Sequence, residues 1–523
     1  MTGARDVIVL DDLLRMGDPD RPALTFRDET VTYAELAERV AAAAAGLRGL
    51  GLRHGDRVVV FLGKRIETVV AMLAVSAAGG VFVPVNPVAK PVQVGYIAAD
   101  CAARVLVTTH ERHRVLVGEL TGATTIEHAV LIGDEAPAAP VPPAWSTVGW
   151  AELCSGPAAA RERVIDTDLA AIFYTSGSTG GPKGVVLSHR NLVAGAQSVA
   201  AYLEHTADDV VLSVLPLSFD AGFSQLTTSL IAGGHLVLVD YLLPREVVRM
   251  CARHGVTALT CVPPLWLQLA AQSWSPEATA RLRYFANTGG RMPRTTLGRL
   301  RELFPQAKPF LMYGLTEAFR STYLDPAEVD RRPDSIGRAI PNAEVLVVRP
   351  DGSVCDPGEQ GEIVHRGALV AQGYWNDPAR TAERFRPYPP QAGPARAECA
   401  VWSGDLAYRD DEGFLYFVGR TDDMIKTSGY RVSPTEIEEV AYATGLVGAA
   451  VAFGEEDERL GQHVVLVVTG ADGAVCDVET LRKLLDRDLP KYMLPQRIVV
   501  LDELPRGGTG KFDRPELRRR VAA

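Results

Sequence analysis

Residues 174–185 read YTSGSTGGPKGV, and they follow an apolar run at 170–173 that predicts a strand. Glycine lets the backbone approach an anion closely, hydroxyl side chains donate hydrogen bonds, and Lys183 supplies a positive charge. A flexible surface loop is the plainer alternative, but the preceding strand and the lysine favour a loop that holds a polyphosphate. Because Pro182 stands where a Walker loop requires glycine, the loop is of another kind. We expect a helix capped by Ser188 to follow it.

Five further motifs follow this loop along the chain. They are YGLTE at 313–317, GEI at 361–363, WSGDL at 402–406, GRTDDMIK at 419–426 and PRGGTGK at 505–511. Any one of them could arise by chance. Six motifs in this order and spacing resemble the adenylate-forming superfamily, which contains acyl-CoA synthetases, stand-alone and peptide-synthetase adenylation domains, and luciferases. The resemblance covers essentially the whole chain.

The pattern of apolar residues predicts an α/β fold. Thr32 and Glu35 form a capping box that opens an amphipathic helix, and Gly51 ends it. The uniformly apolar runs at 58–62 and 81–85 predict strands of a parallel sheet that is covered on both faces.

The resemblance divides the chain into two domains. Residues 1–421 are expected to form a large N-terminal domain of several subdomains, with mostly parallel sheets flanked by helices. Residues 422–523 alternate helix and strand on their own, which predicts a small α+β domain. The resemblance implies that this small domain is mobile and that its hinge lies near Asp422.

The composition excludes several classes of protein. Lys and Arg total 54 while Asp and Glu total 64, so the formal charge of −10 argues against nucleic acid or an anionic membrane as partner. Seven scattered cysteines without a CxxC pair, and an N-terminus unlike a signal peptide, favour the reducing cytoplasm. Residues 68–85 approach the length of a membrane span, but their glycines and proline predict a buried helix, a turn and a strand.

The resemblance implies ATP and Mg²⁺ as cofactors and assigns residues to them. The Glu317 carboxylate would hold Mg²⁺, Thr316 would lie near the α-phosphate, and Tyr313 would stack on adenine. Asp405 would accept hydrogen bonds from the ribose hydroxyls, and Arg420 would contact the nucleotide. The remaining nucleotide contacts are assigned to Thr175, Ser176, Gly177, Ser178, Thr179, Gly180, Lys183, Gly289 and Gly290.

Two lysines near the C-terminus are assigned to catalysis. An exposed surface residue would be the ordinary interpretation of Lys511 in its Gly-rich segment. The resemblance implies instead that its ammonium contacts both the incoming carboxylate and the α-phosphate, where charge builds up in the transition state. It also implies that the small domain rotates after adenylation, so that Lys426 and the backbone near Gly429 reach the thioester site.

Residues 215–223, LPLSFDAGF, predict the substrate class. Many acyl- and aryl-CoA ligases carry histidine at the position of Phe219, whereas Phe-Asp-Ala resembles amino-acid-activating members whose aspartate holds the substrate ammonium. A buried carboxylate needs such a partner, although Asp220 could instead cap a helix. Arg320 either binds a second carboxylate or anchors the following strand. The implied pocket residues are Asp220, Ala221, Ser224, Cys261, Ala286, Thr288, Met312, Arg320 and Ser321.

The resemblance therefore implies ATP-dependent adenylation of an amino acid carboxylate. The aminoacyl group would then pass to the phosphopantetheine thiol of a separate carrier protein, because no fused carrier domain is expected in residues 512–523. Free coenzyme A is the alternative acceptor, which would make the protein an AMP-forming acyl- or aryl-CoA ligase. A non-catalytic scaffold is disfavoured because Glu317, Asp405 and Lys511 are all present.

Overall fold

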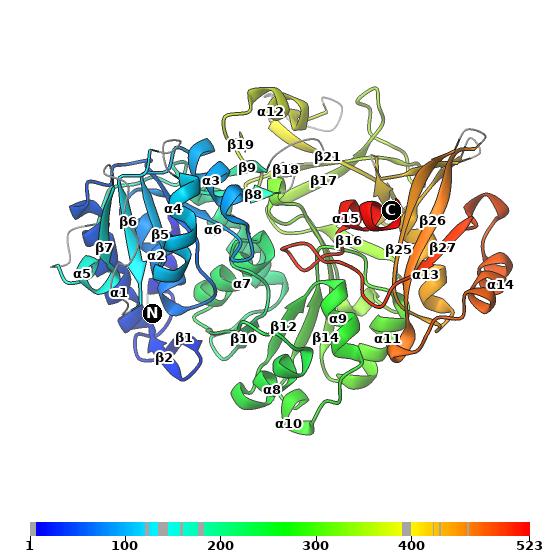
Figure 1. Ribbon diagram of the computed structural model, residues 1–523, viewed down its shortest axis with the longest axis horizontal. Helices are drawn as coiled ribbons and strands as arrows, with labels where there is room; N and C mark the ends of the chain where they lie inside the picture. Colours follow the sequence, from blue (N-terminus) through cyan, green and yellow to red (C-terminus); the bar gives the residue numbers. More distant parts are fainter. Residues whose placement is uncertain are drawn as a thin grey trace.

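The computed structural model describes most of the chain. The described ranges are 7–120, 125–133, 145–156, 161–175, 182–389, 399–421, 423–427, 430–457 and 460–522. Their strands form three sheets, with helices packed around them (Figure 1). Within these ranges every helix is too short or too polar to span a bilayer.

The first sheet comes mainly from the N-terminal third of the chain and is parallel through its centre. Its described strands are, in order across the sheet, β19 (Gly373–Tyr374), β9 (Lys183–Ser188), β8 (Leu169–Thr175), β4 (Val81–Pro84), β3 (Arg57–Val60), β5 (Val105–Thr109), β6 (His128–Ile132) and β7 (Ser146–Gly149). The apolar strands β3 and β4 confirm the prediction of a buried parallel sheet.

The second sheet joins a parallel part to an antiparallel part. Its described strands are, in order, β17 (Ala343–Val348), β18 (Gly361–Gly367), β21 (Cys399–Arg409), β22 (Leu415–Arg420), β16 (Ser335–Ala339), β15 (Thr322–Leu324), β14 (Lys308–Tyr313), β13 (Tyr284–Asn287), β12 (Ala258–Cys261), β10 (Val210–Ser213), β11 (His235–Leu238), β1 (Pro22–Phe26) and β2 (Glu29–Thr32), with β20 (Phe385–Pro387) paired to β21. Pairing is parallel from β14 to β1 and antiparallel from β14 to β17.

The third sheet belongs to the C-terminal part of the chain. Its described strands are β24 (Tyr430–Val432), β23 (Ile425–Thr427), β26 (Gly461–Gly470), β25 (Val447–Asp457) and β27 (Arg497–Val500). The helices α13 (Pro434–Ala443), α14 (Val478–Asp488) and α15 (Arg514–Ala522) accompany it. In Figure 1 the red segment ahead of α15 leaves this sheet and extends to the middle of the molecule. A small α+β unit at the C-terminus was predicted, and it is confirmed.

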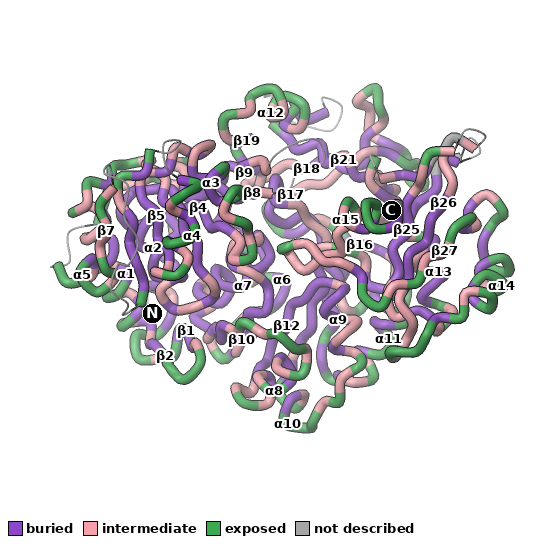
Figure 2. The backbone as a smooth tube through the Cα atoms, in the orientation of Figure 1, coloured by how far each residue is buried: buried purple, intermediate pink, exposed green. Residues whose placement is uncertain are grey.

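Helices flank the first two sheets. The described α-helices are α1 (Tyr33–Gly49), α2 (Ile66–Ala77), α3 (Pro91–Asp100), α4 (His110–Leu120), α5 (Trp150–Leu153), α6 (His189–Tyr202), α7 (Asp220–Ile231), α8 (Pro244–His254), α9 (Pro263–Ala270), α10 (Pro276–Thr279), α11 (Arg294–Leu303) and α12 (Pro378–Arg384). Short 3₁₀ helices include η1 (Leu10–Arg15), η2 (Thr316–Ala318) and η3 (Pro326–Glu328). Two of these helices, α2 and α7, are buried along almost their whole length, as the purple colouring of Figure 2 shows.

Local signals explain where several elements begin. The Thr32 hydroxyl accepts a hydrogen bond from the Glu35 amide and the Glu35 carboxylate returns one, which confirms the capping box of α1. Ser188 caps α6 in the same way, as predicted. The helix does not follow the phosphate loop directly, however. Strand β9 comes first and pairs antiparallel with β8, so Lys183 lies on a strand of the first sheet.

Candidate active site

Three side chains meet where the phosphate loop enters the first sheet. Lys183 opens β9, Tyr374 ends the neighbouring strand β19, and Glu317 lies in the 3₁₀ helix η2. The Lys183 ammonium lies 2.7 Å from Glu317 Oε1 and donates to the Tyr374 hydroxyl at 2.8 Å. That hydroxyl donates in turn to Glu317 Oε1 at 2.6 Å. We call these residues the phosphate triad, because the sequence assigns two of them to phosphate and Mg²⁺.

The phosphate triad keeps the Glu317 carboxylate ionised. Burial alone would raise its pKa, but the Lys183 charge and the hydrogen bonds of Lys183 and Tyr374 outweigh burial and hold the pKa below its usual value. Among the described residues no group of three or more His, Cys, Asp or Glu side chains could hold a metal ion. A single ionised carboxylate fits Mg²⁺, which takes few protein ligands and completes its shell with phosphate oxygens and water.

A second cluster contains the residues assigned to the adenosine part of ATP. The Tyr313 hydroxyl at the end of β14 donates to Asp405 Oδ2 at 2.6 Å, and Arg420 Nη1 lies 3.2 Å from Asp405 Oδ1. The Tyr313 ring lies nearly parallel to His365, with 6.0 Å between ring centres. The structure thus brings Tyr313 together with Asp405 and Arg420, which lie far from it in the sequence and which the resemblance also assigns to the nucleotide.

Lys511 reaches this region from the C-terminal part of the chain. A Cβ atom built on Gly289 would lie 2.6 Å from Lys511 Cε and 3.3 Å from its Nζ, so a side chain there would displace the lysine. Gly289 also has φ +76°, a conformation that favours glycine. The Lys511 ammonium also lies 5.3 Å from the centre of the Phe219 ring. Burial lowers the pKa of Lys511 below its usual value. The charged groups that act on this ammonium are Asp220, Arg320, Asp405 and Arg420.

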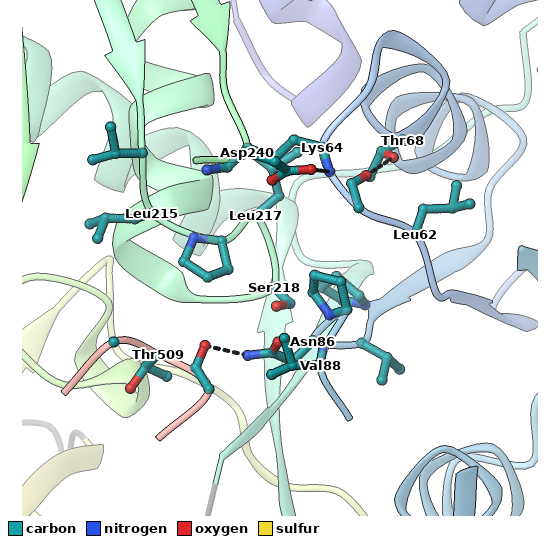
Figure 3. A pocket seen from close by; sticks show the side chains of 18 of the residues that line it. Leu62, Lys64, Thr68, Asn86, Val88, Leu215, Leu217, Ser218, Asp240 and Thr509 are labelled. Atoms are coloured by element: carbon teal, nitrogen blue, oxygen red, sulfur yellow. Dashed lines mark hydrogen bonds between the residues drawn. The ribbon is translucent and has the colours of Figure 1, made fainter. Parts of the chain in front are cut away.

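The segment 505–511, which we call the Lys511 loop, is attached to the N-terminal part. Asn86 Nδ2 donates to the Gly508 carbonyl at 2.6 Å, and Arg506 Nη1 donates to Gln268 Oε1 at 3.1 Å. A Cβ atom on Gly508 would lie 2.6 Å from Asn86 Nδ2, so glycine permits this close contact. Figure 3 shows Asn86 pointing toward the backbone of the loop that carries Thr509. These contacts hold Lys511 inside the site.

A cavity of about 510 Å³ lies beside the Lys511 loop. Its walls come from the carboxyl ends of strands in the first two sheets and from the loop itself, and most of its lining side chains are apolar. The charged residues of the lining are Lys64, Asp240 and Arg506. The buried Lys64 ammonium donates to the Val239 carbonyl at 2.9 Å, and the Lys64 backbone amide donates to Asp240. Burial lowers the pKa of Lys64 to about 8. The cavity can admit a largely apolar group.

The residues assigned to the substrate include a buried ion pair. Asp220 is the first residue of α7, where its Oδ1 accepts a hydrogen bond from the Ala221 amide at 2.8 Å. Its Oδ2 lies 3.6 Å from Arg320 Nη1, and the two side chains are only 4% and 3% exposed. The N-cap of α7 is Phe219, so Asp220 is not the capping residue; it lies in the first turn and faces a cation of the chain itself.

The other predicted pocket residues are buried, but they do not all face this ion pair. The Met312 sulfur lies 2.9 Å from the Tyr202 hydroxyl, and the Thr288 amide donates to the Cys261 carbonyl at 3.1 Å. The titratable neighbours of the Cys261 thiol are Cys251 and Lys64, so Cys261 is placed apart from Asp220 and Arg320. The buried set comprises Ala221, Ser224, Cys261, Ala286, Thr288, Met312 and Ser321.

Some predicted residues lie outside the described ranges. Among the phosphate-loop residues, Thr175 ends β8 with a buried hydroxyl that has no described partner, whereas 176–181 is not described. The predicted hinge Asp422 and the backbone at Gly429 are likewise not described. Lys426 lies on β23, of which only the backbone is described at that position. Thr316 is buried in η2 beside Glu317, and Gly290 accepts a hydrogen bond from Asn287.

Sequence reasoning missed three residues at this site. Tyr374 completes the phosphate triad, His365 stacks on Tyr313, and Phe319 forms a turn between Glu317 and Arg320. Burial lowers the pKa of His365 to about 3, so its ring is neutral. A signal for Tyr374 was available, because the GYW at 373–375 follows the GEI motif closely, but an uncharged side chain gives no electrostatic reason to select it.

Comparisons with known proteins agree with this geometry. The AMP-binding enzyme family matches residues 16–375, and the AMP-binding enzyme C-terminal domain matches residues 436–511. The chain is 34% identical over 514 residues to an L-proline–[L-prolyl-carrier protein] ligase of Streptomyces coelicolor, covering 94% of this chain and 92% of that protein. It is 29% identical over 510 residues to an indoleacetate–CoA ligase of Aromatoleum aromaticum, covering 97% and 96%.

A solved structure extends the agreement to the fold. ATP-bound MatB from Rhodopseudomonas palustris matches with a TM-score of 0.85 and 27% identity, covering 98% of this chain and 99% of that one. The match includes both the large N-terminal part and the small C-terminal part. On these matches, on the fold and on the six ordered motifs, the chain belongs to the AMP-binding enzyme family of the adenylate-forming superfamily, whose members are AMP-forming ligases.

Proposed function

We propose that the protein activates a carboxylic acid with ATP and transfers the acyl group to a thiol. A carboxylate oxygen attacks the α-phosphorus, so that an acyl adenylate forms and pyrophosphate leaves. A thiolate then attacks the carbonyl carbon, and the C–O bond to AMP breaks. The proposal rests on the position of Lys511. The C-terminal segment places its ammonium where the charges of both Asp220 and Asp405 act on it.

Individual residues of the chain have separate roles in the proposed reaction. Lys511 contacts the carboxylate and the α-phosphate and stabilises the charge that builds up during the attack. Lys183 moves from Glu317 to the β- and γ-phosphates when ATP binds, which leaves the Glu317 carboxylate for Mg²⁺. The bound metal ion neutralises phosphate charge. The Tyr374 hydroxyl contacts both partners and keeps the Glu317 carboxylate oriented while they separate.

The two-domain division remains part of this proposal, with residues 1–421 and 422–523 as the domains and Asp422 as the hinge. Strand β22 ends the second sheet at Arg420, and β23 begins the third sheet at Ile425. Four residues thus separate two sheets, which suits a hinge that absorbs backbone rotation. Rotation would withdraw Lys511 and bring Lys426 toward the thioester.

The acceptor is proposed to be the phosphopantetheine thiol of a separate carrier protein, with free coenzyme A as the second candidate. Similarity to the prolyl-carrier-protein ligase supports the carrier, whereas similarity to the indoleacetate–CoA ligase supports coenzyme A. Incubation with both thiols, followed by intact-mass measurement, separates them. We expect acyl transfer to a carrier protein at least ten times faster than to coenzyme A. Faster transfer to coenzyme A contradicts the carrier assignment.

The acid is proposed to be an amino acid whose ammonium is held by Asp220. ATP–pyrophosphate exchange should be measured over α-amino, β-amino, aryl and fatty acids. We expect Asp220→Ala to lower the exchange with amino acids roughly 100-fold, because the ammonium loses its buried partner. Asp220→Asn keeps the side-chain shape and tests charge alone.

A matched control for this prediction is Asp208→Asn, which removes an exposed carboxylate paired with Arg21 and should change nothing. Preference for simple fatty acids, together with an Asp220→Asn variant as active as the wild type, would overturn the amino-acid assignment while leaving adenylation intact.

A further inference from the structure

The guanidinium of Arg320 is buried at the substrate end of the site with one edge unused. Its Nη1 donates to the Phe319 carbonyl at 3.1 Å and lies 3.6 Å from Asp220. Its Nε is buried without a hydrogen-bond partner among the described residues, and Nη2 makes no hydrogen bond to any of them either. A buried donor that is left unpaired costs free energy unless a ligand accepts its hydrogen bond.

The unused edge has the geometry of a carboxylate receptor. In a planar guanidinium, Nε and Nη2 point the same way and match the two oxygens of a carboxylate. Nη1, on the other side, is the nitrogen that the protein engages. Asp220 and the Phe319 carbonyl therefore fix the orientation of Arg320 without consuming the edge that can bind a ligand.

The backbone before Arg320 is strained, and the strain aims its side chain. Phe319 has φ 56° and ψ −53°, and the Arg320 amide donates to the Ala318 carbonyl at 2.6 Å across it. This is a γ-turn of the rare, strained kind, and it is unfavourable at a non-glycine residue. The Phe319 ring is fully buried against Gly195, which holds the turn in place. A strained backbone conformation persists where packing of the surrounding structure leaves the residue no alternative conformation.

The charges around the site are unbalanced in favour of an anion. Lys511, Arg320 and Arg420 supply three positive charges, and Asp220 and Asp405 supply two negative charges. The reacting carboxylate pairs with Lys511. Arg320 then shares Asp220 with any ammonium that the substrate brings, and its open edge still lacks an acceptor.

We propose that the acid substrate carries a second carboxylate, which binds the Nε–Nη2 edge of Arg320. This inference rests on the proposed function and narrows its substrate to dicarboxylic acids. An amino acid with an acidic side chain satisfies it fully, because Asp220 takes the ammonium while Arg320 takes the side-chain carboxylate. The next residue, Ser321, adds a buried hydroxyl without a described partner.

The test compares acids that differ in one end group. ATP–pyrophosphate exchange is measured for diacids and monoacids of equal chain length, from three to eight carbons, and for L-glutamate against L-glutamine and L-norvaline. We expect the best diacid to exceed its monoacid partner in kcat/KM by about 100-fold, mostly through KM. This comparison uses the wild-type protein and needs no variant.

Arg320→Met then removes the charge and keeps the side-chain length. It should lower kcat/KM for the preferred diacid about 100-fold and bring the diacid level with its monoacid partner. For Arg320→Lys, kcat/KM for the preferred diacid should lie between those of the wild type and Arg320→Met, since an ammonium cannot bind both oxygens of a carboxylate as a guanidinium edge does. The matched control is Arg253→Met, which removes an exposed arginine that also pairs with an aspartate, Asp28, and should retain the preference.

The outcomes separate this inference from the proposed function. Exchange with monocarboxylic acids alone, or a diacid preference that survives in Arg320→Met, overturns the inference while adenylation stands. Absence of exchange with every acid overturns both.

Discussion

Replacement of Lys511 by alanine is expected to lower ATP–pyrophosphate exchange by about 100- to 1,000-fold. The C-terminal segment places the Lys511 ammonium beside Gly289 and Phe219. The charges of Asp220 and Asp405 both act on it there. A preorganised cation at the point where negative charge accumulates contributes on this scale. The loss should appear in kcat more than in the KM for ATP, because Lys183 and Asp405, the proposed nucleotide contacts, are unchanged.

The same variant should retain the second half-reaction. When it is supplied with synthetic acyl adenylate, thioester formation should proceed at nearly the wild-type rate, because the proposed domain rotation withdraws Lys511 from the site for that step. Lys491→Ala is the matched control, since Lys491 is an exposed lysine of the same part of the chain, paired with Asp486. Exchange that survives in Lys511→Ala, or equal loss of both half-reactions, contradicts the role given to Lys511.

Replacement of Glu317 by glutamine should have an effect of similar size. The substitution keeps the shape of the side chain but removes the negative charge that Lys183 and Tyr374 hold. We expect exchange to fall at least 100-fold and the Mg²⁺ concentration for half-maximal rate to rise, because the metal loses its only carboxylate ligand in the proposed site. Titration of the exchange rate with Mg²⁺ measures both effects.

Two comparisons make this prediction specific. Tyr374→Phe removes the hydroxyl that bonds to Lys183 and Glu317 but keeps the Glu317 charge, so it should cost roughly 10-fold and leave the Mg²⁺ dependence in place. Glu302→Gln removes an exposed carboxylate that pairs with Arg299 and should have no effect. An unchanged Mg²⁺ dependence in Glu317→Gln would remove Glu317 from the metal site.

Much of the fold could be predicted because its signals are local. The capping box at Thr32 and the apolar strands β3 and β4 depend on residues that are near one another in the sequence. Helix α15 could not be found this way, because its sequence, RPELRRRVA, is mostly charged. Only Leu517 and Val521 anchor it in the core. Similarly, the antiparallel part of the second sheet depends on pairing between strands far apart in the sequence.

The same difference between local signals and long-range contacts applies to the residues of the site. Lys183, Glu317, Asp405 and Lys511 stand in motifs whose residue types suit phosphate and metal chemistry, so the sequence alone leads to their prediction. The ion pair of Arg320 with Asp220 depends on the γ-turn at Phe319. Positive φ at a phenylalanine is unfavourable in isolation, so no local rule predicts it. Only packing of the whole domain makes that turn possible.

The charged groups of the phosphate triad are paired with each other in this structure. Lys183 and Glu317 neutralise each other without ATP, so neither charge is buried alone. Binding of ATP would exchange this contact for two stronger ones, from lysine to phosphate and from carboxylate to metal. The Tyr374 hydroxyl, bonded to both, limits how far either side chain moves.

The most direct test of adenylation follows an oxygen atom. The preferred acid is labelled with ¹⁸O in its carboxylate and converted to the thioester, and the mass of the released AMP is measured. If the carboxylate attacks the α-phosphorus and the acyl C–O bond breaks later, AMP must contain one ¹⁸O from the acid. Unlabelled AMP, or label found in pyrophosphate or inorganic phosphate, would contradict an acyl-adenylate intermediate.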